Sequence, residues 1–528
     1  MSTLHSFAPE DEVLEYDVII AGAGSAGCVL ARRLAEDPEL SVLLIEAGGP
    51  DESLAEISEA RQWAAQLGGP LDWKEVYSPS EAVQGRRIPI PRGRVVGGSS
   101  SINAMLWYRG HPDDYEAWEA AGATGWNYTS LLPYFKRSED WMGGESETRG
   151  AGGPMRIEVS PDPHPVAESL LNGAQELGLP VIEDANAGSN EGACLANFNA
   201  VTQDGSLQRW SAARGYLRPA ASWSNLTILT DTEITELILE SGRCAGVETL
   251  RSGRRSVVRA SRGVVLTLGA LGTPRLLMRS GIGAADQLTR AGVRPAVDLP
   301  GVGANFQDHP LLMGMNFRLK KPRGPIRDNG GGAMLNWRSS QADHRPDLHA
   351  FVVQGAHAGP GVAARFGIDH ADERTFALSP GLMRSQSVGQ IQLRSAAGEL
   401  DIQPNYLAEP SDMSALIEAL DTVLDLAQTR DYAELIESPL SPTGRLSRRE
   451  AEDFVRYSCD TFFHCCGSAS MGTSAMAVVD PELKVYGVDN LWIADASVIP
   501  VIPTCNIQAP VIAVAERAAE LIHERVGR

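Results

Sequence analysis

Three segments near the start of the chain have hydrophobic patterns that together predict a βαβ unit. Residues 16–21, YDVIIA, form a continuous apolar run typical of a buried strand, and residues 41–46, SVLLIE, form a second one. Between them, residues 26–36 place apolar side chains on one face at helical spacing. The turn that joins the first strand to the helix is GAGSAG, at residues 22–27.

The glycines of that turn suit the binding of a dinucleotide. Gly22 permits the tight turn, Gly24 lets backbone N–H groups approach a pyrophosphate at the helix N-terminus, and Gly27 lets the helix pack close to the strand. Glu46 ends the second strand, where a carboxylate can accept a hydrogen bond from a ribose diol. The unit therefore predicts a bound dinucleotide, but by itself it does not separate NAD from FAD.

A later pattern favours FAD. Four short β-like runs predict a meander, at residues 225–229, 233–239, 244–250 and 254–260. They lead into residues 263–283, which predict a buried strand, a turn at Gly269 and a helix with Pro274 in its first turn. A βαβ unit followed by a meander and a returning strand is the layout of large FAD-binding domains. A nicotinamide dehydrogenase would instead continue with further βα repeats.

The segment PRGRVVGGSSSINAMLWYRG, at residues 91–110, adds to this interpretation. Gly97 and Gly98 precede three serines, which gives a flexible loop rich in hydrogen-bond donors that could wrap a polar ring system. A surface linker is the alternative, but it fits poorly because the apolar residues Ile102 and Met105 follow at once.

Four segments resemble the signatures of the glucose–methanol–choline oxidoreductase family. They are GRVVGGSSSIN at 93–103, GALGTPRLLMRSGIG at 269–283, GVGANFQDHP at 301–310 and VYGVDNLWIADASVIP at 485–500. The resemblance runs from residue 16 to residue 524. Among members, SAARGYL at 211–217 and VIPTCNIQAP at 501–510 are most similar to bacterial alcohol oxidases acting on furfuryl or benzyl-type alcohols.

The resemblance implies an α/β fold with two domains. A Rossmann-like FAD-binding domain with a β-meander is expected at residues 16–155, 200–310 and 455–528. An inserted α+β substrate-binding domain is expected at residues 156–199 and 311–454. Within the inserted domain, apolar runs at 349–353 and 390–394 predict strands of a second sheet, and helical spacing predicts a helix over 411–430.

The resemblance also implies a catalytic pair, His464 in CDTFFHCCGSASMGT and Asn506 in PTCNIQAP. Oxidising an alcohol removes a hydroxyl proton and a carbinol hydride. An imidazole suits the proton because it titrates near neutral pH. The hydride goes to flavin N5, which requires the carbon to be held close. We therefore expect His464 to act as the base and Asn506 to orient the substrate oxygen, with Phe463 beside them in the substrate pocket. Each residue could instead be structural: His464 a core histidine, Asn506 a capping or loop residue.

The remaining site residues follow from the two turns and from the resemblance. Contacts with FAD are expected from Gly22, Gly24, Ser25, Ala26, Gly27, Glu46, Ala47, Arg94, Gly97, Gly98, Ser101, Asn103, Ala104, Met105, Ile234, Gly269, Asp495, Ala496, Asn506, Ile507 and Gln508. The last helix, which opens near Pro510, is expected to point its positive N-terminal end at the flavin. Some family members attach FAD covalently through a histidine at the position that Ile102 occupies in this chain. Because Ile102 has no nucleophilic group, non-covalent FAD is expected here.

Two features are expected to be structural. His309 in FQDHP is a family landmark whose turn requires Asp308 and Pro310 more than an acid or base. Cys465, Cys466 and Cys505 lie near the catalytic pair, and with His464 they have the residue types of a metal site. Their spacing matches no recognised ligand pattern, so we expect small apolar packing and no metal.

The composition of the chain disfavours several classes of binding partner. Acidic residues outnumber basic ones by 67 to 46, a formal charge of −21, which disfavours nucleic acid and anionic membranes. No apolar run reaches about 18 residues, so no membrane span is expected. The N-terminal 17 residues lack a basic segment followed by an apolar one, and the seven cysteines are irregularly spaced. Both features favour a cytoplasmic setting.

We therefore expect FAD-dependent oxidation of a primary alcohol to an aldehyde, with O2 as acceptor and H2O2 as product. An acceptor-linked alcohol or choline-type dehydrogenase, using a quinone or dye, is the alternative within the family. Three further hypotheses remain open: a redox-silent flavoprotein like the hydroxynitrile lyases, a nicotinamide dehydrogenase, and a non-enzymatic flavin-binding protein. The sequence identifies neither the alcohol nor the oligomeric state, although a homo-oligomer is compatible with it.

Overall fold

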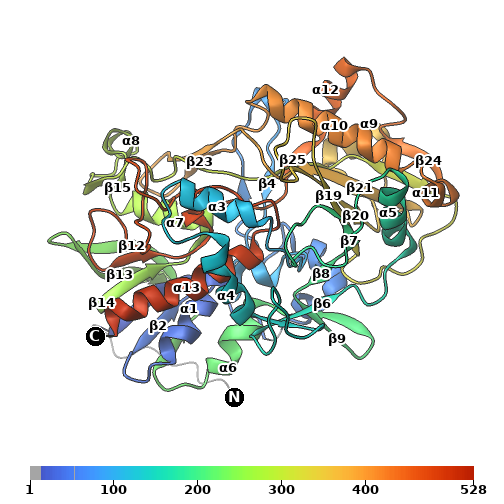
Figure 1. Ribbon diagram of the computed structural model, residues 1–528. Helices are drawn as coiled ribbons and strands as arrows, with labels where there is room; N and C mark the ends of the chain where they lie inside the picture. Colours follow the sequence, from blue (N-terminus) through green and yellow to red (C-terminus); the bar gives the residue numbers. More distant parts are fainter. Residues whose placement is uncertain (1–13, 53, 528) are drawn as a thin grey trace.

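Two β-sheets, each with its own helices, organise the chain in the computed structural model, which describes residues 14–52 and 54–527 (Figure 1). The first sheet contains the N-terminal βαβ unit, and the second contains the middle of the chain. Most of the N-terminal stretch considered for a targeting signal lies outside the described residues. Among the described helices, none is long and apolar enough to cross a membrane.

The predicted βαβ unit is present. Strand β1 (Leu14–Ala21), helix α1 (Ser25–Ala35) and strand β2 (Val42–Ile45) follow the expected order. The two strands are parallel neighbours, with Val18 opposite Val42. All four residues of β2 and the last four of β1 are buried. A strand covered on both faces suits such uninterrupted apolar runs.

The meander joins the same sheet. Its strand order is β11-β2-β1-β14-β13-β12, and the short strand β26 (Leu491–Ile493) also pairs with β14. The bounds are Leu226–Leu229 for β11, Glu233–Glu240 for β12, Arg243–Arg251 for β13 and Arg254–Leu266 for β14. The fourth predicted run and the buried strand predicted after it form one long strand, β14. Its first part is antiparallel to β13 and its second part is parallel to β1 and β26.

The helix after the meander starts earlier than predicted. Helix α7 (Gly269–Arg279) begins at the glycine itself, so Pro274 lies inside it rather than in its first turn. A proline there cannot donate to the carbonyl of Ala270, four residues earlier. The hydroxyl of Ser468 donates to that carbonyl instead, at 2.6 Å, and so compensates for the missing bond.

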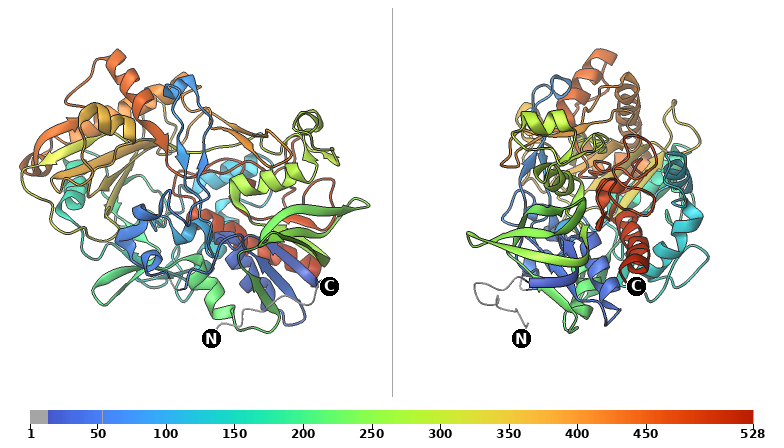
Figure 2. Two further views of the ribbon diagram at one scale, coloured as in Figure 1. Left: turned by 180° about the vertical axis from the view of Figure 1, so that it is seen from behind. Right: turned by 90° about the vertical axis from the view of Figure 1, so that its left-hand side faces the viewer.

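The C-terminal helix α13 (Gln508–Val526) packs against α1 and against α4 (Tyr128–Ser138). The rear view in Figure 2 shows this red helix beside the blue βαβ unit. Glu516 on α13 is fully buried and is paired with Arg33 of α1 at 2.8 Å. The hydroxyl of Tyr216 also donates to it, at 2.6 Å. A buried carboxylate with this many partners fixes the two helices against each other.

The second sheet is antiparallel, with the order β24-β18-β21-β20-β19-β7. The bounds are Ile436–Ser441, Asn316–Leu319, Thr375–Leu382, Leu348–Val353, Ala333–Trp337 and Gly192–Leu195 in that order. Helices α5 (Pro165–Glu176) and α10 (Pro410–Leu426) pack on it. The prediction of a helix after residue 410 is confirmed, but α10 ends at Leu426 because Thr429 starts a new helix, α11 (Arg430–Leu435).

One strand prediction was wrong in its placement. The run at 390–394 does form a strand, β22 (Gln390–Leu393), but it pairs only with β23 (Leu400–Gln403) in a separate hairpin. Hydrophobic pattern alone predicts a strand and not its partner, because pairing depends on contacts distant in sequence.

Candidate active site

A cavity of about 590 Å³ lies between the two sheets. Gly22, Glu46 and Thr267 line it from the carboxyl ends of three parallel strands of the first sheet. Met334 on β19 and Phe351 on β20 line it from the second sheet. Ligands of open parallel sheets bind outside these carboxyl ends, so the cavity occupies the expected place for a nucleotide cofactor.

Most of the predicted site residues meet in this cavity. Both predicted catalytic residues and Phe463 line it. So do the predicted cofactor contacts Gly22, Gly24, Ser25, Ala26, Glu46, Ala47, Gly98, Asn103, Ala104, Met105, Ile234, Gly269, Asp495, Ala496, Ile507 and Gln508. Stretches far apart in the sequence therefore line one cavity.

Four predicted contacts lie behind the lining instead: Gly27, Arg94, Gly97 and Ser101. Arg94 covers the ring of Trp73, with 5.1 Å from the guanidinium carbon to the ring centre. The backbone N–H of Gly97 donates to the carbonyl of Ala23 at 2.7 Å, and the hydroxyl of Ser101 donates to the carbonyl of Val96 at 2.8 Å. The Gly97 bond holds the serine-rich loop against the turn after β1, and the Ser101 bond closes the loop on itself.

The glycines of the turn after β1 fit a pyrophosphate. At Gly27, an added Cβ would lie 1.9 Å from the carbonyl oxygen of Gly22, so only glycine fits there. Gly24 differs, because its backbone angles (φ −74°, ψ −166°) suit any residue and an added Cβ would meet nothing closer than 3.8 Å. The protein itself does not require glycine at 24. The open space above it is what the close approach of a phosphate group requires.

Glu46 fits the role of a ribose acceptor. Its two carboxylate oxygens accept hydrogen bonds from the backbone N–H groups of Ala23, at 2.9 Å, and Gly48, at 2.8 Å. Burial raises the pKa of this carboxyl to about 7, while those hydrogen bonds act in the opposite direction. Each oxygen keeps a further lone pair, so the side chain can still accept from a ribose hydroxyl.

The N-terminal ends of helices α7 and α13 also line the part of the cavity next to the first sheet. Asp495 accepts hydrogen bonds from the N–H of Gly269, at 2.8 Å, and the hydroxyl of Thr273, at 2.6 Å, which fixes the start of α7. At the start of α13, the side-chain oxygen of Gln508 accepts from Ser25 at 3.1 Å, whereas its buried Nε2 has no hydrogen-bond partner. A buried donor facing a cavity is satisfied by a polar ligand, as FAD would provide.

At the end of the cavity next to the second sheet, two paired strands bring two histidines together. Strand β17 (Pro310–Leu312) pairs antiparallel with β25 (Cys459–Thr461). His309 directly precedes β17, and His464 follows β25 by three residues. Phe463 adopts a left-handed conformation, with φ of 65°, which turns the chain before His464.

The predicted catalytic pair is in contact. The Nε2 atom of His464 lies 3.1 Å from the side-chain nitrogen of Asn506. Its Nδ1 atom lies 2.9 Å from Nδ1 of His309. His464 and Asn506 are 7% and 8% exposed, so both are nearly shielded from solvent while still lining the cavity.

Burial favours the neutral form of both histidines. Burial lowers the pKa of His464 well below its ordinary value, and His309, Arg92 and His349 act in the same direction. Burial also lowers the pKa of His309, to about 3. Since Asn506 donates to Nε2 of His464, the proton of that ring is on Nδ1 and is donated to His309. His464 thus presents an unprotonated nitrogen to the cavity.

The sequence-based expectation for His309 was incomplete. We expected a purely structural residue, but its ring contacts the predicted base. Asp308 fulfils the expected structural role: one oxygen accepts from the N–H of His464, at 2.7 Å, and of His309, at 2.9 Å. Its other oxygen accepts from Tyr77, at 2.6 Å, and Tyr406, at 2.5 Å. The FQDHP motif marked this position, but the histidine partner is 155 residues away in sequence.

The second sheet contributes an aromatic wall that the sequence did not reveal. Phe351 on β20 stacks on Phe462, with ring centres 5.2 Å apart and an angle of 13° between the rings. Phe462 in turn lies 4.5 Å from the ring of His464. Leu106 and Met334 line the same cavity. The catalytic pair therefore faces an apolar compartment.

The nearby cysteines are buried thiols. Burial raises the pKa of Cys465 to about 12, and it also raises the pKa values of Cys466 and Cys505. The hydroxyl of Tyr77 lies 3.3 Å from the sulfur of Cys465. Across the described part of the chain, no group of three or more His, Cys, Asp or Glu side chains is arranged to hold a metal ion.

Comparisons of the sequence with known proteins give two family matches. The description "GMC oxidoreductase" applies to both an N-terminal model, matching residues 16–311, and a C-terminal model, matching residues 385–515. The human mitochondrial choline dehydrogenase is 35% identical over 550 residues, covering 96% of this chain and 90% of the relative. The oxygen-dependent choline dehydrogenase of Sinorhizobium medicae is 34% identical over 538 residues, covering 96% of each chain.

Solved structures of other proteins are similar to this chain as well. A pyridoxine 4-oxidase from Mesorbium loti superposes with a TM-score of 0.91 and 34% identity, over 96% of this chain and 99% of that one. A formate oxidase from Aspergillus oryzae RIB40 gives 0.88 and 27%, over 98% and 99% of the two chains. That structure concerns the effect of a mutation on FAD modification in the formate oxidase.

Proposed function

Because the chain belongs to the GMC oxidoreductases, we propose that it oxidises a primary alcohol with an uncharged, apolar or aromatic substituent to the aldehyde. The cofactor is FAD, and we propose O2 as the electron acceptor, with H2O2 as product. The observation that carries the proposal is the neutral His464, which faces the cavity beside Asn506 and an aromatic wall.

Each residue of the pair has a separate task. The amide of Asn506 donates to Nε2 of His464. When a substrate hydroxyl binds between them, its oxygen accepts from the amide instead, and its proton passes to Nε2. His309 accepts from the other ring nitrogen of His464 and keeps it protonated, so Nε2 is the nitrogen that takes the proton. Bound FAD supplies the acceptor for the hydride of the carbinol carbon. The residues that would hold it are the turn after β1, Glu46, Asp495 and the start of α13.

The cavity lining disfavours a cationic substituent. Among the described residues, four acidic side chains line the cavity: Glu46, Glu75, Glu233 and Asp495. None of them belongs to the second sheet, which contributes Met334 and Phe351 instead. An apolar ring or alkyl chain packs well against such a wall.

The two sheets support the predicted domains, apart from β25, which pairs with β17 of the second sheet although it lies in 455–528. We propose a cofactor-binding domain at 16–155, 200–310 and 455–528, and a substrate-binding domain at 156–199 and 311–454. A cytoplasmic location is proposed with them, since all seven cysteines are unpaired. We also propose that the protein forms a homo-oligomer.

The pKa of the base leads to a pH prediction. Since the pKa of His464 is lowered well below 6.5, the side chain is already almost entirely in its reactive neutral form at neutral pH. The rate of flavin reduction at saturating alcohol should change less than about twofold between about pH 6 and pH 9, and fall only in stronger acid. Anaerobic stopped-flow measurements across this range test it. A fall centred near pH 6.5 would show that the base is not desolvated as described.

A choline-type dehydrogenase is the second candidate, because the human and Sinorhizobium medicae relatives are named choline dehydrogenases. Choline carries a permanent cation, which an aromatic face can also attract. The two candidates differ in the substrate, and they differ in the acceptor only where the dehydrogenase uses a quinone or dye, since the Sinorhizobium medicae relative is named oxygen-dependent.

Steady-state assays with benzyl alcohol, furfuryl alcohol, 1-butanol and choline separate them. We expect benzyl or furfuryl alcohol to have the highest kcat/KM, with one H2O2 released for each O2 consumed. Turnover of choline alone, or turnover only when a quinone or dye is added, would contradict the proposal and favour the dehydrogenase. A yellow protein that no alcohol reduces would favour the redox-silent lyase.

A further inference from the structure

The segment that carries Asn506 is held almost entirely by side chains. In residues 500–504, the carbonyl of Pro500 accepts from Asn305 and Gln307, and the carbonyl of Val501 accepts from Trp118. The N–H of Ile502 donates to Gln307 at 3.1 Å. Helix α13 holds the chain after Asn506, but no sheet or helix fixes residues 500–504, so individual side chains hold the chain before Asn506.

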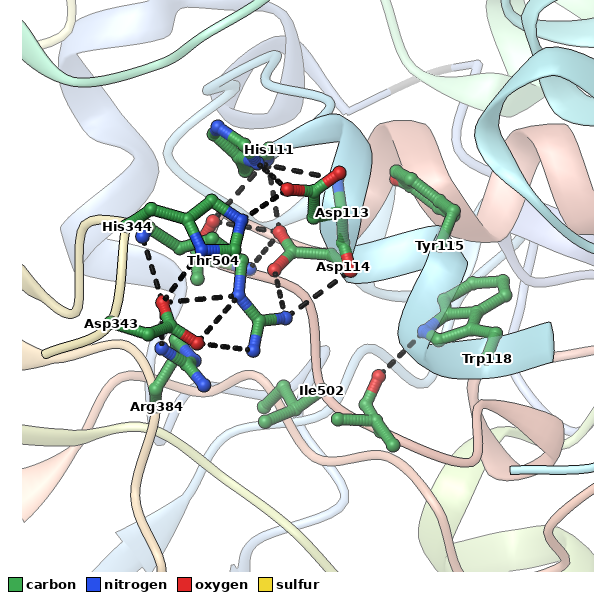
Figure 3. Close-up of polar contacts among 12 residues, drawn as sticks. His111, Asp113, Asp114, Tyr115, Trp118, Asp343, His344, Arg384, Ile502 and Thr504 are labelled. Carbon is green, nitrogen blue, oxygen red and sulfur yellow. Dashed lines mark hydrogen bonds and ion pairs between the residues drawn. The ribbon is translucent and has the colours of Figure 1, made fainter. Parts of the chain in front are cut away.

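Asp114 holds this segment through two hydrogen bonds from Thr504. One of its carboxylate oxygens accepts from the backbone N–H of Thr504, at 2.8 Å, and from the Thr504 hydroxyl, at 2.7 Å. The same oxygen accepts from the N–H of His111 at 2.9 Å. Figure 3 shows the Asp114 carboxylate directed at Thr504. Thr504 lies two residues before Asn506.

The carboxylate is itself fixed. Asp114 is only 2% exposed and lies in the first turn of α3 (Pro112–Ala120), where its bond to His111 forms half of a capping box. Burial raises its pKa, and the bonds from Thr504 act in the opposite direction. Arg345 approaches its other oxygen at 3.6 Å and balances part of the charge.

The junction between Gly110, Asp114 and Cys505 is closely packed. At Gly110, where φ is +82°, an added Cβ would lie 2.8 Å from the Asp114 carboxylate and 3.3 Å from the sulfur of Cys505. The carbonyl of Thr504 also accepts from the side-chain amide of Asn190 at 2.9 Å. Thr504 is therefore held on its N–H, hydroxyl and carbonyl groups at once.

We propose that Asp114 is a positioning residue for the catalytic amide of Asn506, acting through Thr504. The inference rests on the proposed function only in calling that amide catalytic. Asp114 does not line the cavity, so it acts on substrate solely by fixing the backbone two residues before Asn506. A side chain displaced by about 1 Å can lose up to a hundredfold in rate.

Asp114→Asn tests the proposal, because it keeps the shape and removes the charge that three donors share. Flavin reduction by the best alcohol of the panel should slow about tenfold or more at saturating alcohol, with a smaller change in KM. Thr504→Val removes the hydroxyl bond to Asp114 and two longer bonds, at 3.3 Å, that the hydroxyl accepts from His111 and Asn190. It keeps the backbone bond to Asp114 and should slow flavin reduction less. The matched control is Asp113→Asn, on the same helix, whose 40% exposed carboxylate pairs with the exposed His344; less than a twofold change is expected.

Two readouts separate positioning from a general structural role. In an Asn506→Ala background, Asp114→Asn should slow flavin reduction less than about twofold further, because its effect passes through the missing amide. A crystal structure of the Asp114→Asn holoenzyme should show the 3.1 Å contact between Asn506 and His464 lengthened or lost.

An equal slowing in both backgrounds, or an unchanged contact in the crystal, would overturn the proposal. If no alcohol reduces the wild-type flavin, the proposed function fails. The crystallographic contact then still decides the role of Asp114.

Discussion

Replacing His464 with alanine is expected to slow flavin reduction by alcohol by about two to four orders of magnitude while leaving FAD content unchanged. The reason is geometric and electrostatic. His464 presents the unprotonated ring nitrogen beside Asn506, and burial together with His309, Arg92 and His349 keeps that nitrogen neutral. Rapid anaerobic mixing of the variant with the best alcohol measures the effect directly.

Chemical rescue distinguishes a lost base from a damaged site. The deleted ring leaves a space beside Phe462, whose ring centre lies 4.5 Å from that of His464. Added imidazole should therefore restore part of the rate in His464→Ala, and should not accelerate the wild type. A variant that reduces its flavin at a near-normal rate would remove His464 from the role of base.

Two glycines in one turn should both weaken FAD binding when changed to alanine, but only one of the changes should destabilise the protein. Gly27→Ala places a Cβ 1.9 Å from the carbonyl oxygen of Gly22, so α1 must move away from β1. Overpacking of this kind costs about 3 kcal/mol of stability, with or without FAD. Because the helix start that faces the pyrophosphate also moves, most of the bound FAD should be lost.

Gly24→Ala is the matched control, since its added Cβ has open space and its backbone angles suit alanine. The FAD-free protein should be as stable as wild type or more stable by about 0.5 kcal/mol, because alanine restricts the unfolded chain. FAD affinity should nevertheless fall at least about tenfold, because the methyl group occupies the space for the phosphate. Thermal unfolding of the FAD-free proteins and FAD titration measure the two effects separately. Unchanged affinity in Gly24→Ala would exclude the pyrophosphate from this turn.

Local patterns predicted the N-terminal βαβ unit well. The run YDVIIA, the turn GAGSAG and Glu46 predicted the βαβ unit to within a few residues, because strand, turn and helix lie within one short stretch of sequence. Neighbouring residues determine such structure, and glycine spacing carries the steric requirement directly.

The second half depends on distant contacts, which a pattern does not contain. Phe351 and Phe462 stack although 111 positions separate them, and nothing in either stretch marks the other. The same holds for His309, which becomes a partner of His464 only because β17 pairs with β25. The misplaced Pro274 has a similar cause, since Ser468 supplies the compensating bond from far along the chain.

The measurement that tests the central claim most directly is anaerobic reduction of the purified yellow protein by benzyl alcohol and by its α,α-dideuterated form. If a hydride leaves the carbinol carbon while His464 takes the hydroxyl proton, the flavin absorbance falls with both alcohols and more slowly with the deuterated one. It then recovers when air is admitted, with H2O2 formed. Flavin absorbance that stays constant with these and every other alcohol of the panel would contradict the account.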